Sequence, residues 1–178
     1  MNLDAIYARQ LVELGYLADI VEEMGYTAQI IEAGGDVPYH TLLVKLEPDG
    51  KGRDRQMACT FYPLTEEDSE NILLLQYFLE LPFEFLTKAK PQVHQLLISL
   101  NNKSVLGHFG ITDGQNKIHH RYIQSYASSN LLFEQATSEV VSLFNYTSLI
   151  FGEAIEAVAT QQKTAKEAIQ SLQQLPIS

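Results

Sequence analysis

Five histidines are the residues of this 178-residue chain best suited to bind a metal ion or transfer a proton. His119 and His120 are neighbours in a predicted strand, so their side chains point to opposite faces of the sheet and do not share one metal ion. His108 lies on the preceding predicted strand and could sit across from one of them, but two histidines fall short of the three or four ligands that zinc requires. His40 and His94 have no acidic or cysteine partner at a recognisable spacing. We therefore expect ordinary strand residues and no metal site.

The only cysteine, Cys59, offers no better case for catalysis. It alternates with apolar neighbours in a predicted strand, which is typical of a buried thiol that packs as a small hydrophobic group. A nucleophilic cysteine needs a nearby histidine and a basic setting, and neither is evident around this position. One cysteine also excludes an intramolecular disulfide framework. We expect no catalytic residue and no cofactor, and hence no enzyme.

The remaining motifs indicate loops and turns. Residues 65–70 read Thr-Glu-Glu-Asp-Ser-Glu and concentrate four carboxylates, but they lack the spacing and the glycine of a calcium-binding loop. A solvated loop before an apolar strand is the predicted role. Gly34-Gly35 and Gly107-x-x-Gly110 do not stand between a strand and a helix, as a phosphate-binding loop requires. Both patterns predict turns or places where two backbones approach closely.

Charge and hydropathy narrow the class of partner. Lys and Arg number 12 against 22 Asp and Glu, and the net charge of −10 belongs to residues 1–80, which hold 15 acidic and 5 basic residues. An acidic chain without a basic tract does not suit nucleic acid or an anionic membrane. The most apolar stretch, residues 140–159, is interrupted by Asn145, Glu153 and Glu156, and the N-terminus has no secretory pattern. We expect no nucleic-acid partner, no membrane segment and a cytoplasmic location.

The elements that position these residues begin with a helix from about Leu3 to Met24, where apolar residues recur every three or four positions and Gly25 follows. Alternating strands follow at 27–33, 40–47 and 55–62, and Pro48-Asp49-Gly50-Lys51-Gly52 predicts a turn between the last two. A fourth strand at 71–79 is almost wholly apolar. We expect it to be central, covered on both faces, and ended by Pro82.

The second half predicts a helix at 91–100, strands at 104–112 and 117–125 around the hairpin signal Asp113-Gly114, and a long helix at 130–162. The long helix is apolar on more than one side, so we expect both the sheet and other elements against it. The order α-β-β-β-β-α-β-β-α predicts an α+β single domain over 1–162, an antiparallel sheet flanked by three helices. Residues 163–178 are expected to extend the last helix or to form a short separate helix or tail.

Residues 93–158 carry a recognisable pattern of helix end, hairpin and long apolar helix. Its segments are Gln95-Leu96-Leu97-Ile98-Ser99-Leu100-Asn101, Leu106-Gly107-His108-Phe109-Gly110-Ile111, Ile118-His119-His120-Arg121-Tyr122 and Ala154-Ile155-Glu156-Ala157-Val158. This pattern resembles the YbjN-like family of bacterial sensory transduction regulators, whose fold is similar to that of class I type III secretion chaperones. The resemblance implies a homodimeric α+β domain without established catalytic residues or cofactor. Chaperones of this shape bind an extended segment of a partner protein.

Two functional hypotheses follow. The first is a non-enzymatic protein-binding or regulatory domain, chaperone-like and homodimeric, with a possible protein or peptide client. The apolar surplus motivates it, because a chain of this length does not hide every apolar face; the expected partner-binding residues are Phe109, Arg121, Tyr122, Phe144 and Phe151. The alternative is a small-ligand-binding domain or undetected enzyme with a pocket near the late hairpin, using Arg121, Tyr122, His108 or His120.

Overall fold

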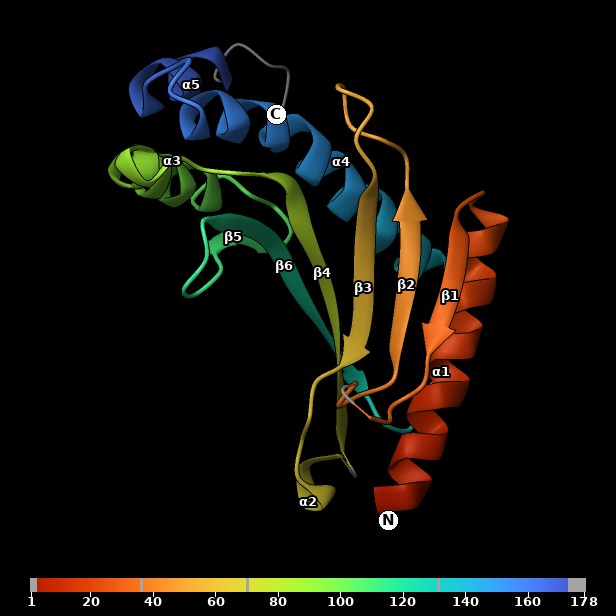
Figure 1. Ribbon diagram of the computed structural model, residues 1–178. Helices are drawn as coiled ribbons and strands as arrows, with labels where there is room; N and C mark the ends of the chain where they lie inside the picture. The colour runs from red at the N-terminus through yellow and green to blue at the C-terminus, as the bar shows by residue number, and fades with distance from the viewer. Residues whose placement is uncertain (1–2, 36, 70, 131, 173–178) are drawn as a thin grey trace.

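One antiparallel sheet of six strands organises this computed structural model, which describes residues 3–35, 37–69, 71–130 and 132–172 (Figure 1). The strands are β1 (Thr27–Ile31), β2 (Thr41–Leu46), β3 (Arg55–Phe61), β4 (Ile72–Glu84), β5 (His108–Ile111) and β6 (Lys117–Ala127). Their order across the sheet is β1-β2-β3-β4-β6-β5. The predicted α+β class and antiparallel sheet are confirmed, and β4 is central between β3 and β6.

The predicted number of three helices is wrong for the described part of the chain. The three expected helices are present as α1 (Leu3–Glu23), α3 (Lys90–Asn101) and α4 (Glu134–Ala159), and a 3-10 turn at Thr87–Ala89 precedes α3. One turn of helix, α2 (Glu66–Ser69), stands where a loop was expected. The hydroxyl of Thr65 accepts a hydrogen bond from the Asp68 backbone N–H at 3.2 Å and caps this turn.

The predicted tail contains a separate short helix, α5 (Ala165–Leu172). The chain leaves the end of α4 through Gln161, whose φ is +61°, and starts again at a capping box. In this box the Thr164 N–H donates to a Glu167 carboxylate oxygen at 2.7 Å, and the Glu167 N–H donates to the Thr164 hydroxyl at 3.3 Å. Ala165 and Ala168 are buried, and α5 packs on α3 and α4. The last six residues, 173–178, lie outside the described part.

Strand β4 runs through Pro82 to Glu84, so the expectation that Pro82 ends this strand is wrong. Pairing with β3 stops at Met57 and Leu79, and the register with β6 shifts between Glu80 and Glu84. Pro82 therefore falls in an irregular stretch, where its missing N–H removes no regular ladder hydrogen bond. Beyond this point β4 stays with β6 and separates from β3.

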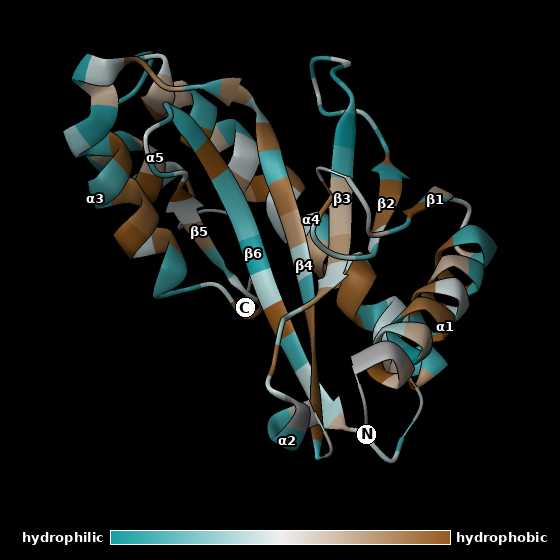
Figure 2. Cartoon of the chain, turned by 60° about the horizontal axis from the view of Figure 1, so that its bottom comes forward, coloured by the Kyte–Doolittle hydropathy of each residue, from teal (hydrophilic) through white to brown (hydrophobic). Residues whose placement is uncertain are grey.

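All the long helices lie on one face of the sheet. Helix α1 packs on β1 to β3, α4 on β4, and α3 on β5, while α5 contacts α3 and α4 (Figure 1). As the sequence predicted, α4 contacts the sheet and also the other long helices. Alternate side chains of each strand enter this core, and the burial of the side chains alternates along β4. Figure 2 shows that β4 is mostly apolar, whereas polar and apolar residues are mixed along β6.

No helix packs on the opposite face in the described part of the chain, which we call the open face. The expectation that β4 is covered on both faces is therefore wrong. Its inward residues, such as Leu75 and Tyr77, are fully buried, whereas the apolar residues between them, such as Leu74 and Phe78, keep partial exposure. The continuous apolar sequence of β4 is therefore compatible with helices on only one face of the sheet.

Candidate functional site

The two adjacent histidines point to opposite faces of the sheet, as predicted. His119 is half-buried on the open face, and His120 is fully buried among the helices. The His120 ring is stacked between Phe109 and Phe144, with ring centroids 4.3 Å and 4.1 Å away. His108 lies opposite Arg121 in the ladder, so the suggestion that it pairs with one of the two histidines is wrong. In the described part of the chain, no three His, Cys, Asp or Glu side chains are arranged to hold a metal ion.

Hydrogen bonds determine the tautomer of His120. Desolvation lowers the pKa of this side chain to about 4, so the ring is neutral at physiological pH. Its Nε2–H donates to the Leu106 carbonyl oxygen at 3.0 Å, which leaves Nδ1 to accept from the Ser148 hydroxyl at 2.7 Å. The Ser148 proton is shared with the Phe144 carbonyl oxygen at 2.8 Å. A histidine with this pKa is a poor general base at neutral pH. The hydrogen-bonded side chains of His120 and Ser148 therefore contribute to the packing of the core.

Three of the five expected partner-binding residues lie in the core. Phe109, Phe144 and Phe151 are 2%, 0% and 7% exposed, and Phe109 packs edge-on against Phe151. They are therefore not available to a partner at the surface of this structure. Arg121 and Tyr122 are half-buried, but they are successive residues and lie on opposite faces. Tyr122 stacks on Tyr77 on the helix side, and only Arg121 lies on the open face.

The open face carries apolar side chains from five of the six strands. Phe78 on β4 lies opposite Ala58 on β3 and Arg121 on β6, and Ala58 lies opposite Leu43 on β2. The apolar residues of this face within the ladders are Ile31, Leu43, Ala58, Ile72, Leu74, Phe78, Ile123 and Ala127. Most keep partial exposure, and none of the described residues forms a buried core on this side.

Polar groups on the open face are held in place by one another. The Arg121 Nε–H donates to the Gln76 amide oxygen at 2.6 Å, and its guanidinium carbon lies 5.7 Å from the centre of the Tyr62 ring. The Phe78 ring stacks on His119 with centroids 5.1 Å apart. These contacts hold the Arg121 and Phe78 side chains in one geometry on the open face.

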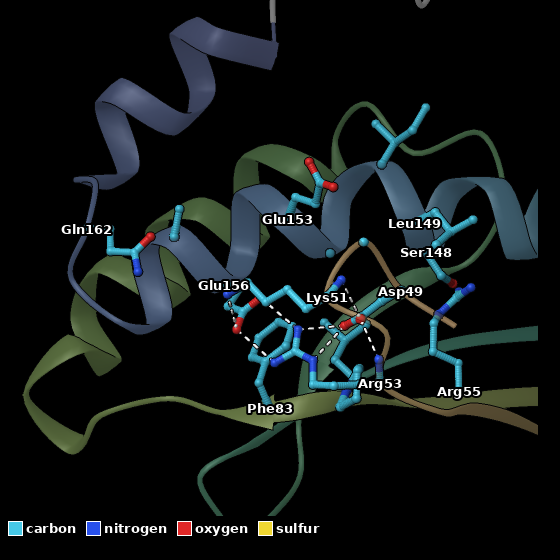
Figure 3. A pocket seen from close by; sticks show the side chains of 16 residues that line it. Asp49, Lys51, Arg53, Arg55, Phe83, Ser148, Leu149, Glu153, Glu156 and Gln162 are labelled. Carbon is cyan, nitrogen blue, oxygen red and sulfur yellow. Dashed lines mark hydrogen bonds and ion pairs between the residues drawn. The ribbon is translucent and has the colours of Figure 1, made fainter. Parts of the chain in front are cut away.

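A pocket of about 460 Å³ opens where β3 and β4 separate (Figure 3). Its walls are the loop between β2 and β3, the end of β4 from Leu81 to Phe83, and α4 from Ser148 to Ala157. The loop contains the predicted turn, where the Gly52 N–H donates to the Asp49 carbonyl oxygen at 2.9 Å. Gly50 lies so close to α4 that a Cβ there would come within 2.9 Å of a Glu153 carboxylate oxygen. The loop is therefore packed on the helix.

Ion pairs clamp the loop to α4. The Arg53 guanidinium donates to both carboxylate oxygens of Glu156 at 2.8 Å and from Nε to the Asp49 carboxylate at 2.7 Å. The Lys51 ammonium lies 2.9 Å from Glu156. The hydrogen bonds from Arg53 lower the pKa of Glu156, and the Glu156 carboxylate in turn raises the pKa of Arg53. Two of the basic residues in the pocket are thus already paired with acids.

The third basic residue, Arg55, is different because it is only 2% exposed. Its Nη1 donates to the Asn145 side-chain oxygen at 2.8 Å and to the Glu47 carbonyl oxygen at 3.4 Å, and its Nη2 lies 3.5 Å from the Asn145 carbonyl oxygen. Asn145 also donates to the Glu47 carboxylate at 2.9 Å and so stands between the two charges. Burial lowers the pKa of Arg55.

Sequence reasoning did not select Arg55, Asn145 or Glu156 as site residues. Arg55 occupies an inward position of β3, two residues before Met57, and a charge at such a position was a usable signal. Asn145 and Glu156 break the apolar stretch of α4, but they served only to argue against a membrane span. The pocket described above lies between the β2–β3 loop, β4 and α4, not at the late hairpin, where the alternative hypothesis expected one. His120 reaches its wall only through Ser148.

Neither a protein-family model nor a curated protein sequence matches this chain. The resemblance to the YbjN-like family therefore stays a prediction. Among the described helices, none combines the length and the apolar character needed to cross a lipid bilayer.

Proposed function

We propose that this chain is a non-enzymatic, protein-binding domain that works in the cytoplasm as a homodimer, with two copies joined through their open faces. The observation that carries the proposal is the single-sided sheet. Within the described residues, the helices cover one face, and the other presents apolar side chains from neighbouring strands without a covering layer. Contiguous exposed apolar surface of this kind marks interaction sites.

The charge of the open face favours a second copy of this chain. Its basic residues include Arg121, Lys45 and Lys117, and its acidic residues within the paired ladder are Glu80, 2.6 Å from Lys117, and Glu84, directly opposite Lys117. The excess negative charge of the chain thus lies largely away from this face. Two open faces can approach with little local repulsion, and distant charges are screened beyond about 8 Å at physiological salt.

The size of the open face is adequate for a dimer. Six strands about 4.8 Å apart and roughly 20 Å long give a flat footprint of about 500 Å². Side-chain relief raises the accessible area above this footprint, toward the roughly 800 Å² per partner that a standard interface buries. Leu43, Ala58 and Phe78 lie near its middle and would form the dry centre of the contact.

The resemblance to the YbjN-like family and to secretion chaperones supports the same proposal, since it implies homodimers that hold an extended client segment. We propose the chaperone-like fold on that ground. Nucleic acid and membrane are not expected partners, because the chain is acidic.

Light scattering coupled to size exclusion tests the dimer. Wild-type protein should elute with twice the chain mass of 20.0 kDa. Phe78→Glu places one carboxylate from each copy at the centre of the contact and should give a monomer with unchanged circular dichroism. Ile98→Glu is the matched control, because Ile98 on α3 is 64% exposed and lies away from the open face. A wild-type monomer at about 100 μM, well above the Kd of a stable dimer, would overturn the proposal, as would a dimeric Phe78→Glu variant.

A further inference from the structure

We propose that the pocket between the β2–β3 loop, the end of β4 and α4 binds a small organic anion, whose carboxylate or phosphate group is held by the buried guanidinium of Arg55. This site is separate from the open face, which lies on the other side of the sheet. Either proposal can therefore be refuted without affecting the other.

The first argument is the incomplete pairing of Arg55. A guanidinium has five N–H donors, and the hydrogen bonds of Arg55 use its two Nη groups. Its Nε–H has no acceptor among the described residues, and the only Nη2 contact, at 3.5 Å, is long. No carboxylate of the described residues lies within 4.0 Å of Arg55, in contrast to Arg53 and Lys51. The edge formed by Nε and Nη2 is the one that can bind a carboxylate or phosphate in bidentate fashion.

The second argument is the cost of burying this charge. Removing a guanidinium from water costs several kcal/mol unless a counter-charge and hydrogen bonds compensate. Asn145 supplies neutral acceptors, and the nearby Glu47 carboxylate is engaged by the Asn145 amide. The Glu47 and Asp49 carboxylates act on Arg55 only from beyond ion-pair distance. An anion that enters the pocket would supply a directly bonded counter-charge in a setting of low dielectric constant, where the interaction is strong. Arg55 lines this pocket and is drawn with Ser148 at one end of it in Figure 3.

The third argument is the shape and lining of the pocket. A volume of about 460 Å³ exceeds what a bare inorganic ion needs and falls within the range of small-molecule sites. Leu81, Pro82 and Ile150 provide an apolar wall for the organic part of the ligand. Of the three acids in the lining, Asp49 and Glu156 are engaged by Arg53, so they repel an anion less than unpaired carboxylates would. The third acid, Glu153, lies beside Gly50 and forms no ion pair in the described part of the chain, so it disfavours an anionic group at that place. A ligand with one anionic group and an apolar or weakly polar body fits this arrangement.

Isothermal titration calorimetry at constant ionic strength tests the site, with acetate, succinate, inorganic phosphate and glycerol 3-phosphate as probes. Saturable binding of a carboxylate or a phosphate identifies which group the site prefers. Arg55→Met removes the charge at similar length and should weaken the preferred probe at least tenfold, and Arg55→Lys should lie between this variant and wild type. Lys103→Met is the control, because it removes one positive charge from an exposed position outside the pocket and should leave binding unchanged.

Nuclear magnetic resonance of the wild-type protein keeps the test valid even if the Arg55 variants fail to fold. The Arg55 Nε–H resonance should shift with the preferred probe and saturate with the calorimetric Kd. The proposal is overturned if no probe binds saturably up to about 10 mM, or if binding leaves the Arg55 resonance unmoved. Undiminished binding to a folded Arg55→Met variant has the same consequence, because Arg55 would then serve only to connect β3 with Asn145.

Discussion

Acidification should destabilise this protein through His120, well before its carboxylates are protonated. The pKa of this histidine is 6.5 in the unfolded chain and about 4 in the folded chain, because burial between two phenylalanine rings disfavours the charged form. Below pH 6.5 the unfolded chain takes up a proton that the folded chain does not accept until about pH 4. Stability therefore falls as pH falls through this interval.

The magnitude follows from the two pKa values. At about 1.4 kcal/mol per pH unit, the full interval corresponds to about 3 kcal/mol, of which about 2.5 kcal/mol is lost between pH 7.5 and 4.5. Glu156, whose pKa is lowered from 4.5, loses its stabilising contribution only below this window. His119 contributes in the same direction, since burial also lowers its pKa, but it is half-buried on the open face.

Urea unfolding followed by far-ultraviolet circular dichroism at pH 7.5, 6.5, 5.5 and 4.5 measures this loss, a suitable probe for a chain without tryptophan. His120→Gln should lose about 2 kcal/mol less than wild type between the extreme pH values, because the titrating group is gone. Comparing pH values within each variant cancels the packing change that the substitution also causes. His119→Gln should retain most of the wild-type loss. The reasoning is refuted if His120→Gln is as acid-sensitive as wild type, or if His120 titrates near pH 6.5 in the folded protein.

Two further substitution or labelling experiments test the backbone and the core. Gly107→Ala should cost at least about 2 kcal/mol in urea unfolding, because φ is +73° and a Cβ would lie 2.6 Å from the Arg121 carbonyl oxygen. Gly114→Ala, at φ +70° with open space around it, should cost only about 1 kcal/mol; equal costs would contradict the close approach. Cys59 is fully buried with a raised pKa, so an aromatic disulfide reagent should label it only in denaturant, and rapid native labelling would contradict its burial.

Local sequence patterns predicted much of the fold. The period-two alternation of β2 and β3 identified the inward residues correctly, including the buried Cys59. The adjacency of His119 and His120 was sufficient to place them on opposite faces, because side-chain direction in a strand is set by the backbone. The hairpin at Asp113-Gly114 was likewise found from a turn that requires positive φ, and Gly114 has φ +70°.

The wrong predictions concern features that depend on which distant segments pair or pack together. A proline ends a strand only where the ladder needs a backbone N–H at that position. The shift of register between β4 and β6 removes that need at Pro82. The aromatic surplus suggested an exposed partner surface, but Phe109 and Phe144 enclose His120 inside the core. Neither the register of β4 nor the arrangement of three rings from separate elements is encoded in a local pattern.

The sequence by itself determined the acidic character, the six strands and the alternation that separates inward from outward side chains, because charge and strand geometry are local properties. Only the tertiary structure decided that all the long helices cover the same face and that β3 and β4 separate near Arg55. Both results depend on contacts between residues far apart in the chain: Arg55 meets Asn145 across 90 positions. The open face and the anion pocket, on which the two proposals rest, are products of that long-range packing.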